Sequence, residues 1–407
     1  MSSVSATPPK YVSRFSLSPQ VLLLLSSMLY FAPFLVGGSE VIEMDGLKYF
    51  RTYDTRTGWV ALYCLACICI WIILLPPRTQ TFRTEGPVEI EAFLIKLMLV
   101  PLAAYTLATP ELYSYAKVES LEATDRVHML FYNLCIIAFL FSLLAGWRKN
   151  LYLLGASIAG LGLILYIGHR SFFVIALIGG LYIFYRNASL FTIKLRFLLS
   201  TFGVLGFLAA YKSVYIALKM GNYGLVSERL SPDNLLASMT MGLEQFITFK
   251  ILDFVVTYDY RLACSNLLYL PITIIPFMDN VFDTALCSFN RQVQFKFFTG
   301  YSGGVAANIW AEFFANFGML GIPLLVAVLC LVATALESVM RRVNSPAVVA
   351  GLILAIVQFT FYIQRNELLT AFTFAKRALF LAAFIGLCAA AHRAFAGRAG
   401  SPQGMNR

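Results

Sequence analysis

Three arginines lie at turns or in a loop of an otherwise apolar chain. Arg170 lies in Gly168-His169-Arg170-Ser171 and Arg365 lies in Gln364-Arg365-Asn366-Glu367, each between two apolar runs. Arg291 lies in the long polar interval between these turns. A guanidinium presents a rigid fork of donors that suits phosphate. The pattern therefore indicates binding of an anionic group, although an arginine that snorkels to lipid headgroups would also explain Arg170.

A carboxylate in an apolar segment accompanies these cations. Glu312 lies about one turn into the apolar segment that follows the polar interval, among aromatic residues. A buried carboxylate near a phosphate-binding cluster is typical of a general base for a sugar hydroxyl. The alternative is an ion pair with Arg170 or Arg365 that holds helices together. The sequence leaves both interpretations open.

Further cations have weaker signals. Lys376 and Arg377 are adjacent within an apolar run, so either residues 366–377 form a short interfacial helix or these side chains line a polar crevice. His169 is a lone histidine, for which packing or a headgroup contact is the default interpretation. Three other cations of the polar interval are expected to be solvated surface charges, and they are Arg229, Arg261 and Lys296.

Metal chemistry has no support in the sequence. Neither a Walker phosphate loop nor an HExxH motif occurs, and the three histidines are scattered. Asp279 and Asp283 are four positions apart, which is not the DxD spacing of soluble metal-dependent sugar-nucleotide enzymes. We therefore expect no metal and no cofactor.

Composition indicates a membrane protein. Of 407 residues, 59% are hydrophobic and 13% are charged, against about 25% charged in soluble proteins. A spanning helix needs roughly 20 apolar residues. The formal net charge of +10 is explained by basic residues at cytoplasmic helix ends, so we expect no nucleic-acid partner.

The apolar runs predict an all-α polytopic protein with about ten transmembrane helices and no cleavable signal. The spans lie near 17–37, 59–76, 92–109, 127–146, 150–168, 171–186, 196–218, 308–336, 346–364 and 371–392. With both termini inside, the inner segments hold about twice as many basic residues as the short outer loops, as the positive-inside rule requires. The three arginines then lie on one, outer, face. The predicted organisation is a cytoplasmic tail (1–16), spans one to seven (17–218), a large periplasmic loop (219–307), spans eight to ten (308–392) and a second cytoplasmic tail (393–407).

The large outer loop has features of its own. An amphipathic helix is predicted from Ser231-Pro232-Asp233 to about Val255, lying in the membrane interface or packed on the spans. The stretch 267–278 is too short and proline-interrupted to span, which favours a re-entrant or buried loop. Cys264 and Cys287 lie in this loop and could pair in an oxidising compartment, whereas the other cysteines fall in apolar runs.

Taken together, these features resemble the O-antigen polymerase (Wzy-type) family of bacterial glycosyltransferases. The resemblance covers most of the chain as architecture. Its local motifs are GHRSFF (168–173), GGVAANIWAEFFANFGMLG (303–321) and QRNELLTAF (364–372). The similar O-antigen ligases carry a histidine-asparagine pair eleven residues before the glycine that is Gly318 here. The pair in this chain is Ala307-Asn308, which favours polymerase over ligase.

The resemblance implies a GT-C-like, metal-independent polymerase in the bacterial inner membrane, with its active site facing the periplasm. The substrate would be an undecaprenyl-diphosphate-linked oligosaccharide repeat, and the partners would be membrane lipid and a chain-length regulator protein. Arg170, Arg291 and Arg365 would hold the diphosphate, and Glu312 would orient or deprotonate the acceptor hydroxyl. The further binding candidates are His169, Asn308, Glu367, Lys376 and Arg377. Ligase-type transfer and a flippase for the same lipid-linked sugars are the alternatives, and the sugars and linkage are not predicted.

Overall fold

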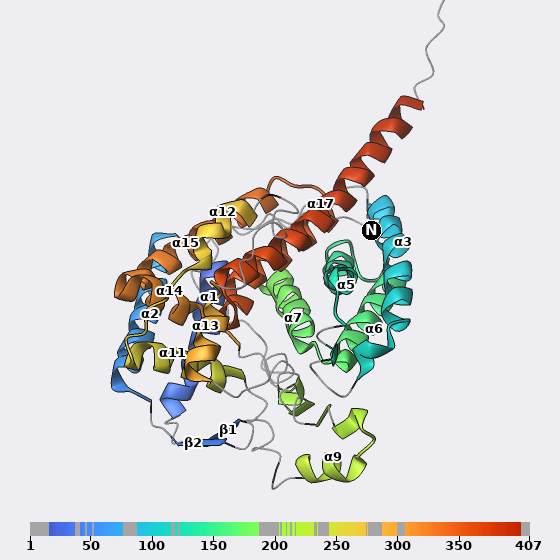
Figure 1. The fold of residues 1–407 in the computed structure, drawn as a ribbon. Coiled ribbons are helices and arrows are strands. Elements are labelled where there is room, and N and C mark those ends of the chain that lie inside the picture. Colours follow the sequence, from blue (N-terminus) through green and yellow to red (C-terminus); the bar gives the residue numbers. More distant parts are fainter. Residues whose placement is uncertain are drawn as a thin grey trace, which may run out of the picture. The chain divides into compact units, whose positions relative to one another are not determined.

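A computed structural model describes most of the chain. The described residues are 16–36, 41–44, 47–50, 53–75, 88–114, 119–120, 123–186, 203, 206–208, 210–211, 214–215, 217–231, 234, 244–273, 275, 287–298 and 306–399. Within them the helices and strands are all helices apart from one antiparallel hairpin, whose register pairs Val41 with Phe50. The predicted helical class is therefore confirmed in its main feature (Figure 1).

The elements follow one another with short connections in most of the described chain. In order they are α1 (Pro19–Val36), β1 (Val41–Met44), β2 (Leu47–Phe50), α2 (Thr55–Leu74), α3 (Val88–Leu107), η1 (Pro110–Tyr113), α5 (Arg126–Leu144), α6 (Leu151–Ile167), α7 (Arg170–Tyr185), α9 (Tyr223–Arg229), α11 (Glu244–Thr257), η3 (Asn266–Tyr269), α12 (Leu270–Thr273), α13 (Phe289–Phe297), α14 (Ile309–Phe317), η5 (Gly318–Leu320), α15 (Gly321–Met340), α16 (Pro346–Thr360), η6 (Tyr362–Arg365) and α17 (Leu368–Ala399).

Five helical segments of the described chain are long and apolar enough to cross a membrane. They are Thr55–Leu74, Val88–Leu107, Arg126–Leu144, Ile309–Met340 and Leu368–Phe395. Four shorter apolar helices, Pro19–Phe34, Leu151–Ile167, Arg170–Tyr185 and Pro346–Thr360, coincide with further predicted spans. The predicted span at 196–218 lies largely outside the described residues. These segments support a membrane-embedded protein.

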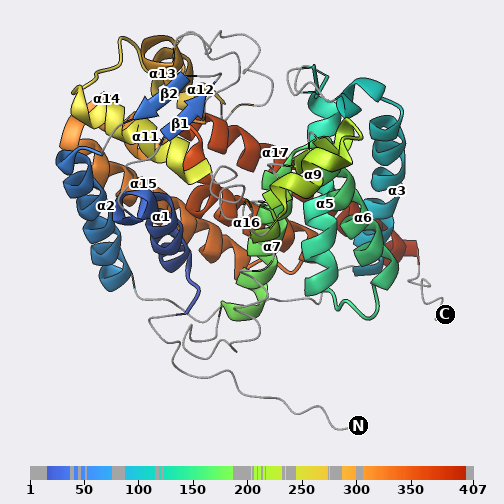
Figure 2. The same ribbon diagram turned by 90° about the horizontal axis from the view of Figure 1, so that it is seen from below.

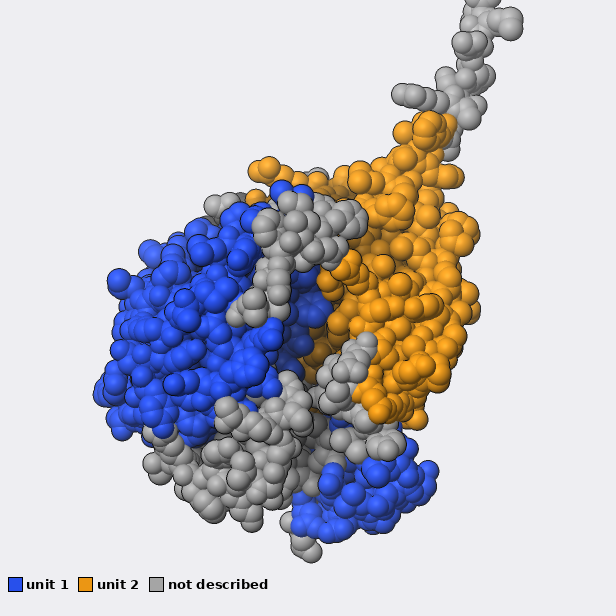
Figure 3. All heavy atoms as spheres, viewed as in Figure 1, with its two compact units in different colours: residues 1–80, 184–335, 356–374 blue, residues 81–183, 336–355, 375–407 orange. Residues whose placement is uncertain are grey.

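The chain divides into two compact units (Figure 3). Unit 1 comprises residues 1–80, 184–335 and 356–374, and unit 2 comprises residues 81–183, 336–355 and 375–407. Each unit holds several of the predicted site residues, so each is described by itself.

Helix α11 lies at the centre of unit 1, in contact with α1, α2 and α14. Its Phe249 is fully buried, and the ring of Phe31 on α1 lies 6.2 Å from it and 6.0 Å from Trp310 on α14. The apolar face of the predicted amphipathic helix thus packs on other helices, which is the second of the two arrangements expected. The beginning of that predicted helix, apart from Ser231 and Asn234, lies outside the described residues.

Unit 2 is built on α5, which packs against both α3 and α6 (Figures 1 and 2). Helix α5 is buried almost throughout its middle, from Phe131 to Ser142. The two helices approach closely at Gly160 of α6, where an added Cβ would lie 2.6 Å from the Cys135 sulfur. The absence of a side chain at Gly160 therefore lets α6 lie against α5.

Two predicted segments differ in the structure. The eighth predicted span is broken at Gly318, where α14 ends and η5 begins with φ 63° and ψ −148°. Only glycine adopts this region of backbone conformation without strain. Residues 366–377 do not form a separate interfacial helix, because α17 runs continuously from Leu368. No glycine or proline interrupts its first turns, so nothing stops helix propagation there.

Candidate active site

Glu312 lies on α14 in unit 1 and is fully buried. Its Oε2 accepts a hydrogen bond from the backbone N–H of Leu368 at 2.9 Å. No group among the described residues donates to its Oε1, and none of the ion pairs in that part of the chain involves Glu312. The predicted alternative of a pair with Arg365 therefore does not account for its position. A buried carboxylate oxygen without a donor is a position for an incoming hydroxyl.

Asn308 positions the helix that carries Glu312. It is the N-cap of α14, where its Oδ1 accepts from the Ala311 N–H at 3.0 Å, and its Nδ2 donates to the Thr248 carbonyl of α11 at 2.9 Å. Asparagine is a preferred N-cap because its side chain satisfies an N–H that the helix leaves free. Both polar atoms of Asn308 are used in this way, so the geometry favours a positioning role over the predicted binding role.

Glu367 lies beside Glu312, at the start of α17. Its Oε1 accepts from the Ser288 hydroxyl and from the Asn290 N–H, the latter at 2.6 Å, and its Oε2 accepts from Asn266 Nδ2 at 2.6 Å. Glu367 is followed by Leu368, whose backbone N–H is the donor to Glu312. Glu367 is thus held by three donors, whereas Glu312 has one.

The donors to Glu367 come from two segments that a disulfide joins. Cys264 and Cys287 form the pair that the sequence left open, with Cα atoms 5.2 Å apart. Gln292 reinforces the junction, because its Nε2 donates to the Cys264 carbonyl at 2.9 Å and its Oε1 accepts from the Ala263 N–H at 3.2 Å.

The turn that contains Arg365 is anchored by its neighbour Gln364. The buried Gln364 amide accepts from Trp310 Nε1 at 2.7 Å and donates to the hydroxyls of Ser26 at 3.1 Å and Ser27 at 2.9 Å. Sequence reasoning missed this network. Its only local signal was a pair of serines inside the first apolar run.

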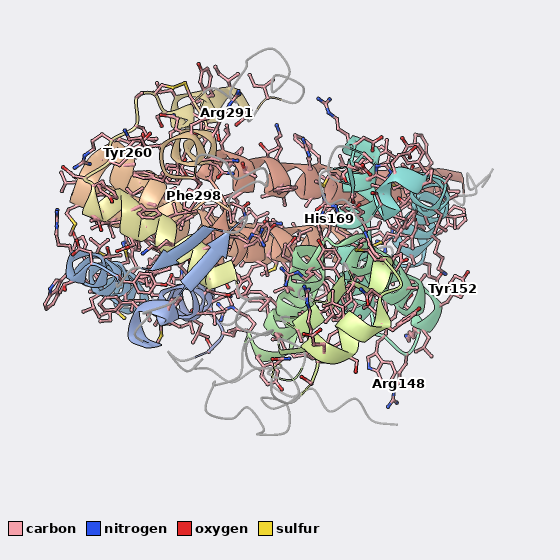
Figure 4. The ribbon with its side chains drawn as sticks, turned by 60° about the horizontal axis from the view of Figure 1, so that its bottom comes forward. Arg148, Tyr152, His169, Tyr260, Arg291 and Phe298 are labelled. Atoms are coloured by element: carbon pink, nitrogen blue, oxygen red, sulfur yellow. A yellow bond between two sulfur atoms is a disulfide. The ribbon has the colours of Figure 1, made fainter. Side chains whose placement is uncertain are left out.

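The arginines of unit 1 have different surroundings. Arg365 is half-buried, and its guanidinium lies 5.5 Å from the Tyr362 ring centroid. Arg291 is exposed on α13 (Figure 4), 5.7 Å from the Phe295 ring centroid. Arg261 is not merely a solvated charge, since its Nη1 donates to the Phe314 carbonyl at the end of α14 at 2.8 Å. It therefore supports the helix that carries Glu312.

The remaining predicted site residues lie in unit 2. Arg170 is the half-buried first residue of α7. His169 (Figure 4) lies with its ring centroid 5.2 Å from that of Tyr132, and its Nε2 is 3.4 Å from the Thr124 hydroxyl. Packing thus accounts for much of its position. Lys376 is half-buried on α17, next to Arg377.

Arg377 lines an open pocket of about 410 Å³. The other lining residues are Thr124, Asp125, Arg126 and Met129. Asp125 caps α5 by accepting from the N–H groups of Val127 and His128. Burial acts to raise the pKa of Asp125, but the hydrogen bonds from the His128 N–H and the Tyr105 hydroxyl outweigh it and lower that pKa. An anionic Asp125 therefore faces this pocket together with two arginines.

The structure thus brings Glu312, Glu367, Asn308 and Arg365 together in unit 1, with Arg291 on a neighbouring helix. It places His169, Arg170, Lys376 and Arg377 in unit 2. Among the described residues no group of three or more His, Cys, Asp and Glu side chains could hold a metal ion. Comparison with protein-family models, curated proteins and solved structures found no match for this chain.

Proposed function

We propose that this protein is a bacterial inner-membrane glycosyltransferase that polymerises undecaprenyl-diphosphate-linked oligosaccharide repeats, with its active site facing the periplasm. The proposal includes about ten spans and a GT-C-like arrangement. The observation that carries it is Glu312, a buried carboxylate next to the turn that holds Arg365, with no donor to one of its oxygens among the residues that the structure describes. The motif resemblance supplies the substrate class.

In the proposed reaction the acceptor hydroxyl oxygen attacks the anomeric carbon of the donor glycan. The bond from that carbon to the diphosphate oxygen breaks, and undecaprenyl diphosphate leaves. Glu312 Oε1 accepts the hydroxyl proton, and Arg365 and Arg291 stabilise the charge on the leaving diphosphate. Arg170 is proposed separately to bind an anionic group of the same substrate class, as are Lys376 and Arg377.

The choice of polymerase over ligase rests on Ala307, which lies where the ligases have histidine. The test is a gel of surface and lipid-linked glycan from a strain without this gene. Loss of the ladder with retention of single repeats on their acceptor supports polymerisation. Long chains that accumulate on the carrier lipid would show a ligase instead. Retention of labelled repeats inside proteoliposomes distinguishes a flippase from both.

Complementation of that strain tests Glu312 directly. Glu312→Gln keeps the shape of the side chain but removes the base, so polymer formation should fall by about 10²- to 10⁴-fold. Glu337→Gln is the matched control, because Glu337 is also buried and accepts a hydrogen bond from the Tyr182 hydroxyl. Equal ladders from E312Q and wild type would remove Glu312 from the mechanism.

Arg170→Ala should abolish long chains while the protein remains inserted. Arg148→Ala is the control, because Arg148 is an exposed arginine of the same unit that lies over the ring of Trp147. Normal polymer from R170A would remove Arg170 from the proposal and leave the headgroup interpretation.

A further inference from the structure

The disulfide of unit 1 lies immediately beside the residues that hold Glu367. Asn266 follows Cys264 by two positions, and Ser288 and Asn290 follow Cys287 by one and three. These three residues supply all the hydrogen bonds to the Glu367 carboxylate among the described residues. Every donor to Glu367 is therefore within three residues of a bridged cysteine.

Besides the disulfide, packing and hydrogen bonds also hold the two donor segments, since the Phe297 ring of α13 stacks on the Phe254 ring of α11 with centroids 5.3 Å apart and Phe289 is fully buried. Ser288 opens α13 by accepting from the Arg291 N–H, and Gln292 of the same helix reaches back to Cys264 and Ala263. The segment between the cysteines, apart from residues 265–273 and 275, lies outside the described residues. The bridge thus joins two cysteines 23 positions apart, and the residues next to both of them donate to one carboxylate, that of Glu367.

Glu367 in turn precedes the backbone donor to Glu312. The Leu368 N–H donates to Glu312 Oε2 at 2.9 Å, and Oε1 has no donor within the described part of the chain. A displaced Glu367 would carry Leu368 with it, because the two are consecutive. A continuous chain of contacts therefore runs from the disulfide, through Glu367, to the proposed base.

We infer that the Cys264–Cys287 disulfide, acting through Asn266, Ser288 and Asn290, positions Glu367 and so makes the transferase depend on an oxidising compartment. This inference rests on the proposed role of Glu312. Formation of the bridge removes two electrons and two protons from the two thiols. They pass by thiol–disulfide exchange to the disulfide of an oxidoreductase in that compartment, which leaves as a dithiol.

The first test is a double-mutant cycle on the rate of polymer formation. Cys264→Ser/Cys287→Ser removes the bridge. Glu367→Gln replaces one carboxylate oxygen, which accepts hydrogen bonds, with an amide N–H₂ group, which cannot accept them. Each should slow polymerisation by roughly tenfold or more, and the triple variant should be no slower than E367Q alone. Additive losses would overturn the inference, because they would show that the bridge acts independently of Glu367.

Two controls exclude a general loss of structure. Cys69→Ser/Cys388→Ser removes two thiols that are free in the structure and should leave the rate unchanged. Combining the bridge variant with E337Q should give additive effects, because Glu337 accepts a hydrogen bond from Tyr182 within unit 2, whereas the bridge belongs to unit 1. Reduction of the wild-type protein with dithiothreitol should reproduce the bridge variant and be reversed by reoxidation.

Hydrogen exchange of residues 288–297 decides the positioning role even if the proposed function fails. Both the bridge variant and E367Q should increase exchange in α13, and their combination should not increase it further. If wild-type protein makes no polymer but exchange follows this pattern, the proposed function is wrong, but the disulfide still positions Glu367. Unchanged exchange after removal of the bridge would refute this positioning role.

Discussion

Gly318 ends the helix that carries Glu312, and its replacement by alanine tests how that helix is terminated. Its φ of 63° and ψ of −148° lie in a region that costs a residue with a side chain about 1–3 kcal/mol. An added Cβ would lie 3.0 Å from Nη1 and 3.2 Å from Nη2 of Arg261. Movement of Arg261 would weaken its hydrogen bond to the Phe314 carbonyl. The Arg261 side chain is half exposed to water, so this loss adds only about 1 kcal/mol to the cost of the backbone strain. We therefore expect G318A to lower the free energy of unfolding by about 2–4 kcal/mol.

Two other glycines separate backbone strain from steric contact. Gly146 has φ +91° but open space around its Cβ position, so G146A should cost only about 1–2 kcal/mol. Gly155 lies inside α6 with open space and no positive φ, so G155A should be neutral or stabilise by about 0.5–1 kcal/mol. Removing Arg261 first, in R261A, should reduce the cost of G318A, because the contact is then absent.

The assay is denaturant unfolding of the purified variants in detergent micelles. Tryptophan fluorescence is an appropriate signal, because the fully buried Trp310 lies on α14 itself. The expected order of stability is G155A, wild type, G146A and G318A. A G318A variant no less stable than G146A would refute the steric part of the reasoning, and one as stable as wild type would refute all of it.

Three further predictions concern packing and capping. Gln364→Ala removes three buried hydrogen bonds and should lower the free energy of unfolding by about 3 kcal/mol, measured by the same unfolding assay. Gly160→Ala should destabilise unit 2 by about 1–3 kcal/mol, because a Cβ would overlap the Cys135 sulfur; an unchanged unfolding midpoint would contradict the close approach of α5 and α6. Asp125→Ala should cost about 1 kcal/mol at neutral pH. Because the folded pKa of Asp125 is lowered, its contribution is present above the unfolded pKa of about 4 and lost as pH falls below it. The stability difference between wild type and D125A should therefore shrink between pH 5 and 3, and a difference that grows there would show the opposite sign of shift.

Local signals in the sequence predicted the helical membrane-embedded class and several individual residues. Apolar runs of spanning length reappear as α2, α3 and α5, because hydropathy and helix length are properties of a single segment. The polarity of Glu312 within such a run marked it as unusual. The occurrence of Cys264 and Cys287 in one loop marked them as a pair to consider.

Other features could not be seen because their partners are distant in the chain. Gln364 donates hydrogen bonds to Ser26 and Ser27, which precede it by 338 and 337 positions. No local sequence pattern indicates which polar groups will meet over such a separation. Arg261 was expected to be solvated, but folding brings it to the end of a helix 53 residues later. Asn308 looked like a binding residue, yet its Nδ2 donates to the Thr248 carbonyl 60 positions earlier in the chain.

The sequence by itself determined which segments are helical and apolar, and which few polar residues interrupt them, because each depends on neighbouring residues alone. Only the tertiary structure decided that Glu367 is held by three donors and Glu312 by one. Burial and hydrogen bonding of a carboxylate depend on segments from different parts of the chain, and here on the disulfide that joins two of them.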